Sequence, residues 1–364
     1  MNRSYTYPLL PHAKQKACIQ NILNCVCLLH NYYVADLLDK KINTKSSKIV
    51  FDKYVNIHPE LKKCDPSALF YEIFHMLDNG SCNRIITYKS KYTTSYFTKY
   101  KQETPITKSY VYLPTVGHVR YKNTRQLPNN AILKSFTIKQ NFDDKYFISI
   151  AFEVKDKISN ISLDISNSIG LDYSSPCFIV DSNGIRLEAP HYFKRARDDI
   201  KKQRLKLRKY PKDSKRYAKE MIKLIKMHKK VANKRNNFLH HLSKEYAKKY
   251  DYIFVEDLNL DEISRKKNLG IATHDNAYYE FLKYLGYKAK DNNHKLIKVN
   301  RYFPSTKKCH NCGYINRNLT LKDRIWECPN CHMIHDRDYN SALNIKYEGI
   351  SIVCGKPMAD RCAL

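Results

Sequence analysis

Four cysteines near the end of the chain have the spacing of metal ligands. Cys309 and Cys312 form one pair and Cys328 and Cys331 a second, with two residues inside each pair and fifteen between the pairs. Such a turn directs two thiolates at one ion from about 2.3 Å, so two turns complete a closed tetrahedral zinc site. A closed site leaves no position for water, so we expect a structural zinc ribbon. Three nearby histidines are competing ligands, namely His310, His332 and His335. Only the cysteines fit the symmetric pattern.

Three carboxylates are candidates for a second, catalytic site. Asp172 lies in the apolar segment 168–173, and Glu256 lies near the end of the apolar segment 251–258; both segments are expected strands. Neighbouring strand residues point to opposite faces, so only one of Glu256 and Asp257 can share a site with Asp172. Asp338 opens an expected final helix, where a carboxylate is also a good N-cap, which is the alternative role for this residue.

The elements that must position these acids follow one another in a recognisable order. Three strands in 168–189 are followed by helices at 191–209 and about 213–250, a strand at 251–258, a helix at 277–289, a strand ending near 303 and the final helix. This is the order of an RNase H-like domain, in which the first and fourth strands are neighbours. We therefore expect Asp172, Glu256 and Asp338 to converge. Hard oxygen ligands suit Mg²⁺ or Mn²⁺, and two such ions can promote phosphodiester hydrolysis.

The charge of the chain points to a polyanionic partner. Lys and Arg number 65 and Asp and Glu 35 in 364 residues, a net charge of +30. Between Lys201 and Arg235 there are sixteen basic residues and two acids, which is too one-sided for paired salt bridges along a solvated helix. We expect ten of these residues to contact nucleic acid: Lys201, Lys202, Arg204, Arg208, Lys215, Arg216, Lys223, Lys230, Lys234 and Arg235.

The first part of the chain combines strands and helices. A strand is expected at 3–9, helices at about 11–41 and 65–77, and a further helix near 93–101. From residue 108 the pattern changes to short alternating strands, typical of a small antiparallel barrel or sandwich. The segment 157–166 reads as a linker, and 259–275 as a mobile loop placed to act as a lid over the acids.

Other features of the chain bear on its compartment. No apolar run approaches the roughly 18 residues of a membrane span, and the N-terminus lacks the apolar core of a signal peptide. The eight cysteines outside the two pairs show no paired framework, which fits free thiols in a reducing cytosol. We expect a cytoplasmic protein, associated with the nucleoid if the source is bacterial.

Four segments carry a resemblance to a known family. They are IGLDYSS around Asp172, FVEDLNL around Glu256, FPSTKKCHNCGY at the first cysteine pair and HDRDYNSALNI around Asp338. The chain resembles TnpB, the insertion-sequence-encoded relative of type V CRISPR effectors, over almost its whole length. The family carries a glycine soon after the first acid, whereas Tyr173, Ser174 and Ser175 follow here, which affects the turn and leaves the carboxylate in place.

The resemblance implies an RNA-guided DNA endonuclease that cuts beside a short flanking motif. Asp172, Glu256 and Asp338 would be the metal-binding catalytic acids of a RuvC-like nuclease domain, with Asp336 as runner-up for the third. This domain would occupy 165–300 and 338–350, with the zinc ribbon inserted at 301–337 and a tail at 351–364. A β-barrel (wedge) module at 1–10 and 104–160 would be interrupted by a helical recognition module at 11–103. The partners would be a guide RNA from the element's own end and double-stranded target DNA, bound by a monomer or homodimer.

Two other classes of function stay open from the sequence. The first is a nuclease-inactive, RNA-guided DNA-binding repressor; because all three acids are present, the sequence favours activity. The second is a transposase or a structure-specific resolvase that acts directly on DNA with the same acids. The sequence does not give the guide RNA, the flanking motif or the cut positions.

Overall fold

The chain forms two compact units, Met1–Ile158 and Ser159–Leu364. The computed structural model describes residues 2–39, 47–81, 89, 94–99, 106–141, 143–154, 163–174, 177–259, 275–320 and 322–355. Most of the linker expected at 157–166 and of the lid expected at 259–275 lies outside these ranges. Among the described residues, no helix is both long and apolar enough to cross a membrane.

The first unit is built on an antiparallel sheet with the strand order β2-β5-β6-β1-β4-β3. Strand β1 (Asn2–Leu10) pairs antiparallel with β6 (Tyr146–Val154), so the first residues join the same sheet as the later strands. The other strands are β2 (Ser95–Lys99), β3 (Tyr110–Leu113), β4 (Gly117–Tyr121) and β5 (Ala131–Gln140). Among the described residues, β2 and β3 lie at opposite ends of this order and no pairing between them is seen, so the barrel or sandwich expected from the sequence stays a prediction.

Helices pack against this sheet and share its core. They are α1 (Ala13–Leu38), α2 (Ser47–Ile57), the 3₁₀ helix η1 (Pro59–Lys63) and α3 (Pro66–Ser81). Buried Ile19, Leu23 and Ile73 from the helices join Ile148 and Ile150 from β6 in one apolar cluster. The segment 95–99 is a strand and not the helix that we expected there, because its alternating residues enter the sheet beside β5. Helix α2 was not predicted.

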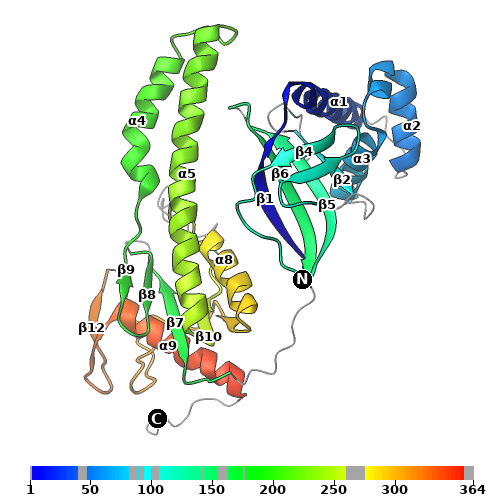
Figure 1. Ribbon diagram of the computed structural model, residues 1–364. Coiled ribbons are helices and arrows are strands. Elements are labelled where there is room, and N and C mark those ends of the chain that lie inside the picture. The colour runs from blue at the N-terminus through cyan, green and yellow to red at the C-terminus, as the bar shows by residue number, and fades with distance from the viewer. Residues whose placement is uncertain are drawn as a thin grey trace. The chain divides into compact units, whose positions relative to one another are not determined.

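The second unit has a mixed sheet with the order β11-β10-β7-β8-β9 (Figure 1). Its strands are β7 (Ser168–Tyr173), β8 (Ile179–Asp181), β9 (Arg186–Leu187), β10 (Tyr252–Glu256) and β11 (Lys295–Val299). Strand β10 runs parallel to both β7 and β11, whereas β8 and β9 run antiparallel to their neighbours. The expected adjacency of the first and fourth strands of this unit is therefore confirmed.

Helices cover both faces of this sheet. On one face, α5 (Lys215–Lys249) and α8 (Tyr278–Asp291) bury the odd-numbered side chains of β7 and β10, such as Ile169 and Ile253. On the other face, α9 (Arg337–Cys354) packs Ile345 against Phe254 of β10. The even-numbered residues of β7 and β10, which include Asp172 and Glu256, thus belong to the α9 face.

Two glycines allow α9 to lie directly on the strands. A methyl group on Gly170 of β7 would lie 2.7 Å from the backbone nitrogen of Lys346 and closer still to the carbonyl oxygen of Ala342. A methyl group on Gly349 of α9 would overlap the ring of Phe254. The absence of a side chain at each position therefore sets the distance between α9 and the sheet.

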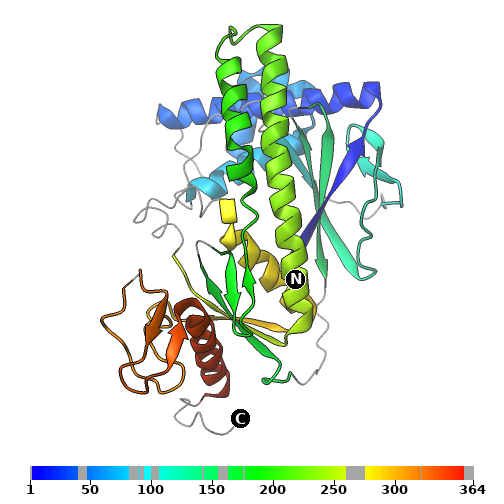
Figure 2. The ribbon, with the colours of Figure 1, turned by 90° about the vertical axis from the view of Figure 1, so that its left-hand side faces the viewer.

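The basic segment forms a helical hairpin that extends beyond the sheet of its unit (Figures 1 and 2). Helix α4 (Tyr192–Leu207) packs on the first half of α5 through a small apolar cluster that includes Ile200, Leu224 and Val231. Ser214 caps α5, since its hydroxyl accepts a hydrogen bond from the Tyr217 N–H at 3.0 Å. Both helices lie within a few residues of the positions predicted from the sequence.

Candidate active site and cysteine cluster

Asp172 and Glu256 meet at the carboxyl ends of two parallel strands. Strands β7 and β10 pair in register from Ser168 opposite Tyr252 to Leu171 opposite Val255. One step further along the same register places Asp172 beside Glu256, and both side chains project from the face that α9 covers. The sequence thus brings the two predicted acids together through strand pairing alone.

Helix α9 brings the third acid to this edge of the sheet. Its N-cap is Asp336, whose carboxylate accepts a hydrogen bond from the Tyr339 N–H at 2.9 Å and pairs with Arg186. Asp338 therefore does not cap the helix, contrary to the alternative role considered for it. It lies in the first turn with only 6% of its surface exposed. The helix start thus divides the two aspartates into a capping residue and a buried carboxylate.

Hydroxyl groups fix the two buried aspartates. Ser341 of α9 donates a hydrogen bond to Asp172 at 2.9 Å, and Ser174, just after β7, donates one to Asp338 at 3.0 Å. The two hydrogen bonds cross between the strand and the helix, because each links an acid on one element to a serine on the other. They hold the carboxylates in place when α9 lies on the sheet.

Three guanidinium groups surround Asp338. Arg337 lies 3.2 Å from its Oδ1, and Arg324 and Arg186 lie 3.7 and 3.9 Å from its Oδ2. Arg324 directly precedes β12 (Ile325–Glu327), between the two cysteine pairs, and Arg186 lies in β9, so the three cations come from three different segments. Such groups balance the charge of the buried carboxylate.

The pKa values of the other two acids are raised. Burial raises the pKa of Asp172 well above its ordinary value; Glu256 and Asp338 raise it further, and Ser341 and Arg337 oppose the shift. Burial also raises the pKa of Glu256 to about 7. Two carboxyl groups with raised pKa values at one sheet edge are typical of a functional site that binds cations.

The cysteine cluster is the second predicted site, and the structure brings its four thiols together. The Sγ atoms of Cys309 and Cys331 lie 3.7 Å apart, and those of Cys312 and Cys328 lie 3.6 Å apart. Among the described residues, these four form the one group of three or more potential ligands whose ligand atoms all lie within 4.8 Å of one another. The three acids are thus near neighbours without forming so compact a group.

The two cysteine turns repeat one backbone conformation. In each turn, the residue four positions after the first cysteine donates its N–H to that cysteine's carbonyl at 2.9 Å: Gly313 to Cys309 and His332 to Cys328. Both residues have a positive φ, +80° for Gly313 and +56° for His332. A short hairpin of β12 (Ile325–Glu327) and β13 (Ile334–Asp336) joins the second turn to α9. The cluster is therefore built from two equivalent turns.

The three histidines considered as ligands have other partners. His332 is exposed and lies 2.8 Å from Glu327, and the ring of His310 lies 3.1 Å from the Asn340 amide oxygen. His335 is buried, with its Nε2 3.0 Å from the Cys309 Sγ, a position from which it can support a thiolate without replacing it.

The basic residues selected from the sequence lie on the α4–α5 hairpin or in the turn that joins its two helices. Nine of the ten are exposed, and Arg235 is half-buried. Glu220, one of the two acids in this segment, is occupied within the hairpin: it accepts hydrogen bonds from Gln203 at 2.8 Å and Lys223 at 2.9 Å, which lower its pKa to about 2. The hairpin therefore carries a large excess of exposed positive charge.

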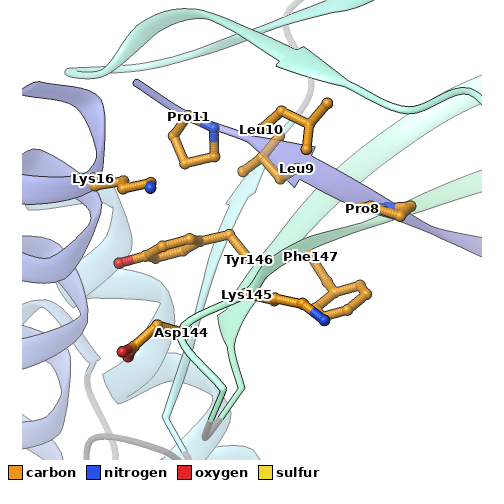
Figure 3. Close-up of a pocket in the computed structure, with 9 residues that line it drawn as sticks. All are labelled: Pro8, Leu9, Leu10, Pro11, Lys16, Asp144, Lys145, Tyr146 and Phe147. Atoms are coloured by element: carbon orange, nitrogen blue, oxygen red, sulfur yellow. The ribbon is translucent and has the colours of Figure 1, made fainter. Parts of the chain in front are cut away.

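A separate pocket of about 380 Å³ lies in the first unit (Figure 3). Leu10 and Pro11 lie above the ring of Tyr146, with Lys16 of α1 and Asp144 of the β5–β6 turn at its end. All of the residues that line this pocket belong to the first unit.

Sequence reasoning identified the acids and cysteines but missed the residues that position them. Ser341 and Asn340 lie in the segment used for the resemblance, yet their roles become visible only when α9 is placed between sheet and cysteine cluster. Tyr278, at the start of α8, was also missed. Its hydroxyl is buried without a hydrogen-bond partner among the described residues, and its pKa is raised by burial and by Asp172 and Glu256.

Comparison with known families gives two matches, both after residue 150. Residues 151–267 match the family described as "Probable transposase", OrfB_IS605, and residues 278–345 match the family described as "Cas12f1-like, TNB domain". The first match includes Asp172 and Glu256, and the second includes the four cysteines and Asp338.

Individual relatives agree with these matches. A Streptomyces pristinaespiralis protein named "Putative RNA-guided DNA endonuclease" is 28% identical over 233 residues, covering 64% of this chain and 57% of the relative. The TnpB-like protein L79 of Acanthamoeba polyphaga mimivirus is 33% identical over 147 residues, covering 38% of this chain and 27% of the relative. The matched region thus spans less than two thirds of the length of these relatives.

A solved structure shares the fold. The chain in the cryo-EM structure of a Cas12f1–sgRNA–target DNA complex superposes with a TM-score of 0.57 at 15% identity, covering 92% of this chain and 83% of that one. The motifs, the family matches and the named relatives agree: this chain is similar to TnpB-like proteins in the segments that carry the acids and the cysteines.

Proposed function

We propose that the protein is an RNA-guided DNA endonuclease of the TnpB type, which cuts target DNA beside a short flanking motif by two-metal phosphodiester hydrolysis. The observation that carries the proposal is the convergence of Asp172, Glu256 and Asp338 at one edge of the sheet. The name of the Streptomyces relative and the complex in which the Cas12f1 fold was solved support the choice of guide and target.

The residues of the acid site fit a hard divalent cation. Asp172 and Glu256 offer carboxylate oxygens whose raised pKa values reflect burial without full neutralisation by a neighbouring base. We propose that these two acids and Asp338 hold Mg²⁺ or Mn²⁺. When bound, a pair of such ions supplies an activated water and stabilises the leaving oxygen of the phosphodiester.

The protein's own groups orient the reaction. Hydrogen bonds from the Ser341 and Ser174 hydroxyls hold the carboxylates of Asp172 and Asp338 in place. Arg324 and Arg337 place positive charge beside Asp338, where it can stabilise charge developing on a scissile phosphate. Because burial raises the pKa of the metal-free Glu256 carboxyl to about 7, binding of a cation there would release its proton.

The cysteine cluster fits structural zinc. For a tetrahedral ion with bonds of about 2.3 Å, ligand sulfurs lie about 3.8 Å apart. The observed separations of 3.6 and 3.7 Å agree with this value. We propose that Cys309, Cys312, Cys328 and Cys331 bind one Zn²⁺ and that this ion stabilises the fold without entering the reaction.

We assign the remaining parts of the chain by the same proposal. Residues 165–300 and 338–350 form the RuvC-like nuclease domain, and 301–337 the inserted zinc ribbon. The sheet of the first unit and its helices, at 1–160, act as the wedge and recognition modules that read the short motif beside the target. The exposed cations of the α4–α5 hairpin contact the phosphates of the guide–target duplex.

The test begins with the nucleic acid that co-purifies with the protein expressed from its native flanking DNA. We expect one discrete RNA that ends in sequence from beyond the gene. This RNA, reprogrammed toward a plasmid, should direct Mg²⁺-dependent cleavage that Asp172→Ala abolishes. Asp336→Ala is the matched control, because it removes a neighbouring carboxylate outside the proposed ligands. A random mixture of nucleic acid and no guided cleavage would refute the proposal.

A second candidate function is DNA strand joining, which the match to a family described as "Probable transposase" favours. The same three acids would serve this reaction. Strand-transfer products from transposon-end DNA, formed without any RNA, would support it against guided cleavage.

A further inference from the structure

The first turns of α9 carry three buried polar residues. Asn340, Ser341 and Asn344 are 1%, 0% and 0% exposed, respectively. Helix α9 lies between the central sheet and the cysteine hairpin, so these side chains meet different neighbours on different sides of the helix (Figure 2). Buried polar side chains need hydrogen-bond partners, and the partners of these three show which elements the helix connects.

Asn340 binds the backbone on both sides of the first metal ligand. Its Nδ2 donates to the Lys308 carbonyl at 2.8 Å, and its Oδ1 accepts from the His310 N–H at 2.9 Å. Lys308 and His310 flank Cys309 directly, so one side-chain amide pairs with the chain just before and just after this cysteine. This arrangement fixes the position of the first cysteine turn relative to α9.

Asn344 strengthens the same connection one turn later. Its Nδ2 donates to the Lys308 carbonyl at 2.6 Å and to the Ser305 carbonyl at 2.8 Å. The Lys308 carbonyl therefore accepts hydrogen bonds from two asparagines of α9. The segment that enters the cysteine cluster is held along more than one turn of the helix.

The residues on either side of Asn340 hold the acid site. Ser341, the next residue, donates to Asp172, and Asp338, two residues before, accepts from Ser174. Within four consecutive residues, α9 therefore carries Asp338, binds the backbone around Cys309 and holds Asp172. A rigid helix transmits a displacement at one of these contacts to the others.

We propose that Asn340 is a positioning residue that couples the cysteine cluster to the acid site, so that a metal ion bound by the cysteines raises the affinity of the acids for their divalent cation. The proposal rests on the function proposed above. Metal binding fixes the turn at Cys309, the turn fixes Asn340, and α9 then holds Asp338 and Ser341 in the arrangement described. Groups that orient metal ligands in this way typically change metal affinity by about 10- to 100-fold.

The test measures Mn²⁺ binding at the acids of the full chain, with the cysteines either loaded with zinc or stripped of it. Electron paramagnetic resonance reports free and bound Mn²⁺, and loss of the signal change in Asp172→Ala identifies the acid site. We expect stripping zinc from the wild-type protein to weaken Mn²⁺ binding by about 10-fold or more. Equal Mn²⁺ affinity in the two forms would overturn the proposal.

Asn340→Ala separates coupling from simple folding. The zinc-loaded variant should already bind Mn²⁺ about as weakly as the stripped wild-type protein, and stripping its zinc should weaken binding little further. Asn318 is an exposed asparagine between the two cysteine pairs, and Asn318→Ala should keep the full wild-type difference in Mn²⁺ affinity between the zinc-loaded and stripped forms. A zinc effect of undiminished size in Asn340→Ala would show that the coupling does not pass through this residue. If this variant fails to retain zinc, the wild-type comparison alone decides whether the sites are coupled.

Failure of this inference is distinct from failure of the proposed function. Guided cleavage by the zinc-loaded wild-type protein tests the function and does not depend on Asn340. Guided cleavage together with zinc-independent Mn²⁺ affinity would leave the endonuclease in place and remove the coupling. Zinc-dependent Mn²⁺ affinity without guided cleavage would keep the coupling and refute the endonuclease.

Discussion

Replacing Gly170 with alanine tests the contact on which the acid site depends. A methyl group there would lie 2.7 Å from the Lys346 backbone nitrogen, whereas ordinary contacts begin at 3.4 Å. Relief of the contact with Lys346 alone needs a retreat of α9 by 3.4 − 2.7 = 0.7 Å, and the closer contact with the Ala342 carbonyl oxygen needs a larger one. The clash involves backbone on both sides, so a change of rotamer cannot relieve it.

The retreat has a cost that can be worked out. Overpacking costs about 1–3 kcal/mol, and a shift of this size would lengthen the 2.9 Å hydrogen bond from Ser341 to Asp172 beyond useful range, which costs about 1.5–3 kcal/mol more. Alanine recovers about 0.5–1 kcal/mol because it restricts the unfolded chain more than glycine does. We expect the free energy of unfolding to fall by about 2–5 kcal/mol and divalent-dependent cleavage to be lost.

Urea unfolding of the zinc-loaded protein measures the first quantity, and plasmid cleavage with the programmed guide measures the second. The matched control is Gly286→Ala, in the interior of α8, where the new methyl would lie 3.4 Å from the Leu296 side chain. This variant should be as stable as the wild type or more stable by up to about 1 kcal/mol, because alanine favours a helix. If Gly170→Ala behaved like Gly286→Ala, the close packing of α9 on β7 would not be what positions the acids.

Three further predictions concern charge. With no divalent cation at the acids, the free energy of unfolding should fall as pH rises from about 4.5 to 7, because the folded Glu256 carboxyl keeps a proton that the unfolded chain releases. This fall should amount to at most about 3 kcal/mol. Urea titrations across the pH range should show a flatter dependence for Glu256→Gln. Asp336→Ala should cost about 1 kcal/mol of stability through the lost α9 cap while cleavage persists, whereas Asp338→Ala should abolish cleavage; equal losses of activity would contradict the roles assigned to the two aspartates. Lys230→Ala should weaken guide-RNA binding and reduce the slope of log K against log salt by about 1, as filter binding at several salt concentrations would measure; an unchanged slope would place this lysine away from phosphate.

The sequence predicted the fold where local pattern and long-range pairing agree. The apolar segments around Asp172 and Glu256 are short and unambiguous, and the order of elements placed their strands side by side, as the register confirms. The cysteine spacing predicted a four-thiol cluster because two residues between cysteines almost fix the turn. These features depend on few residues close together in the chain.

Other features depend on contacts that no local pattern contains. The segment 95–99 is a strand because β5 offers it an edge, and its sequence gave no sign of this partner. The assignment of the helix start to Asp336 or Asp338 turned on a difference of two residues, which capping preferences do not resolve. The links through Ser341 and Asn340 required the position of α9 between two other elements. Long-range packing, and not propensity, decided each of these cases.

The length of α5 makes it a rigid spacer within the second unit. A helix of 35 residues at 1.5 Å per residue is about 52 Å long, and no proline interrupts Lys215–Lys249. Its last turn lies beside the start of β7, since the Asn167 side chain donates a hydrogen bond to the Lys249 carbonyl at 3.1 Å, whereas Asp172 lies near the other end of that strand. The cations of its first half therefore extend from the sheet on one continuous rod, and the base of this rod is anchored at the end of β7 away from the acids.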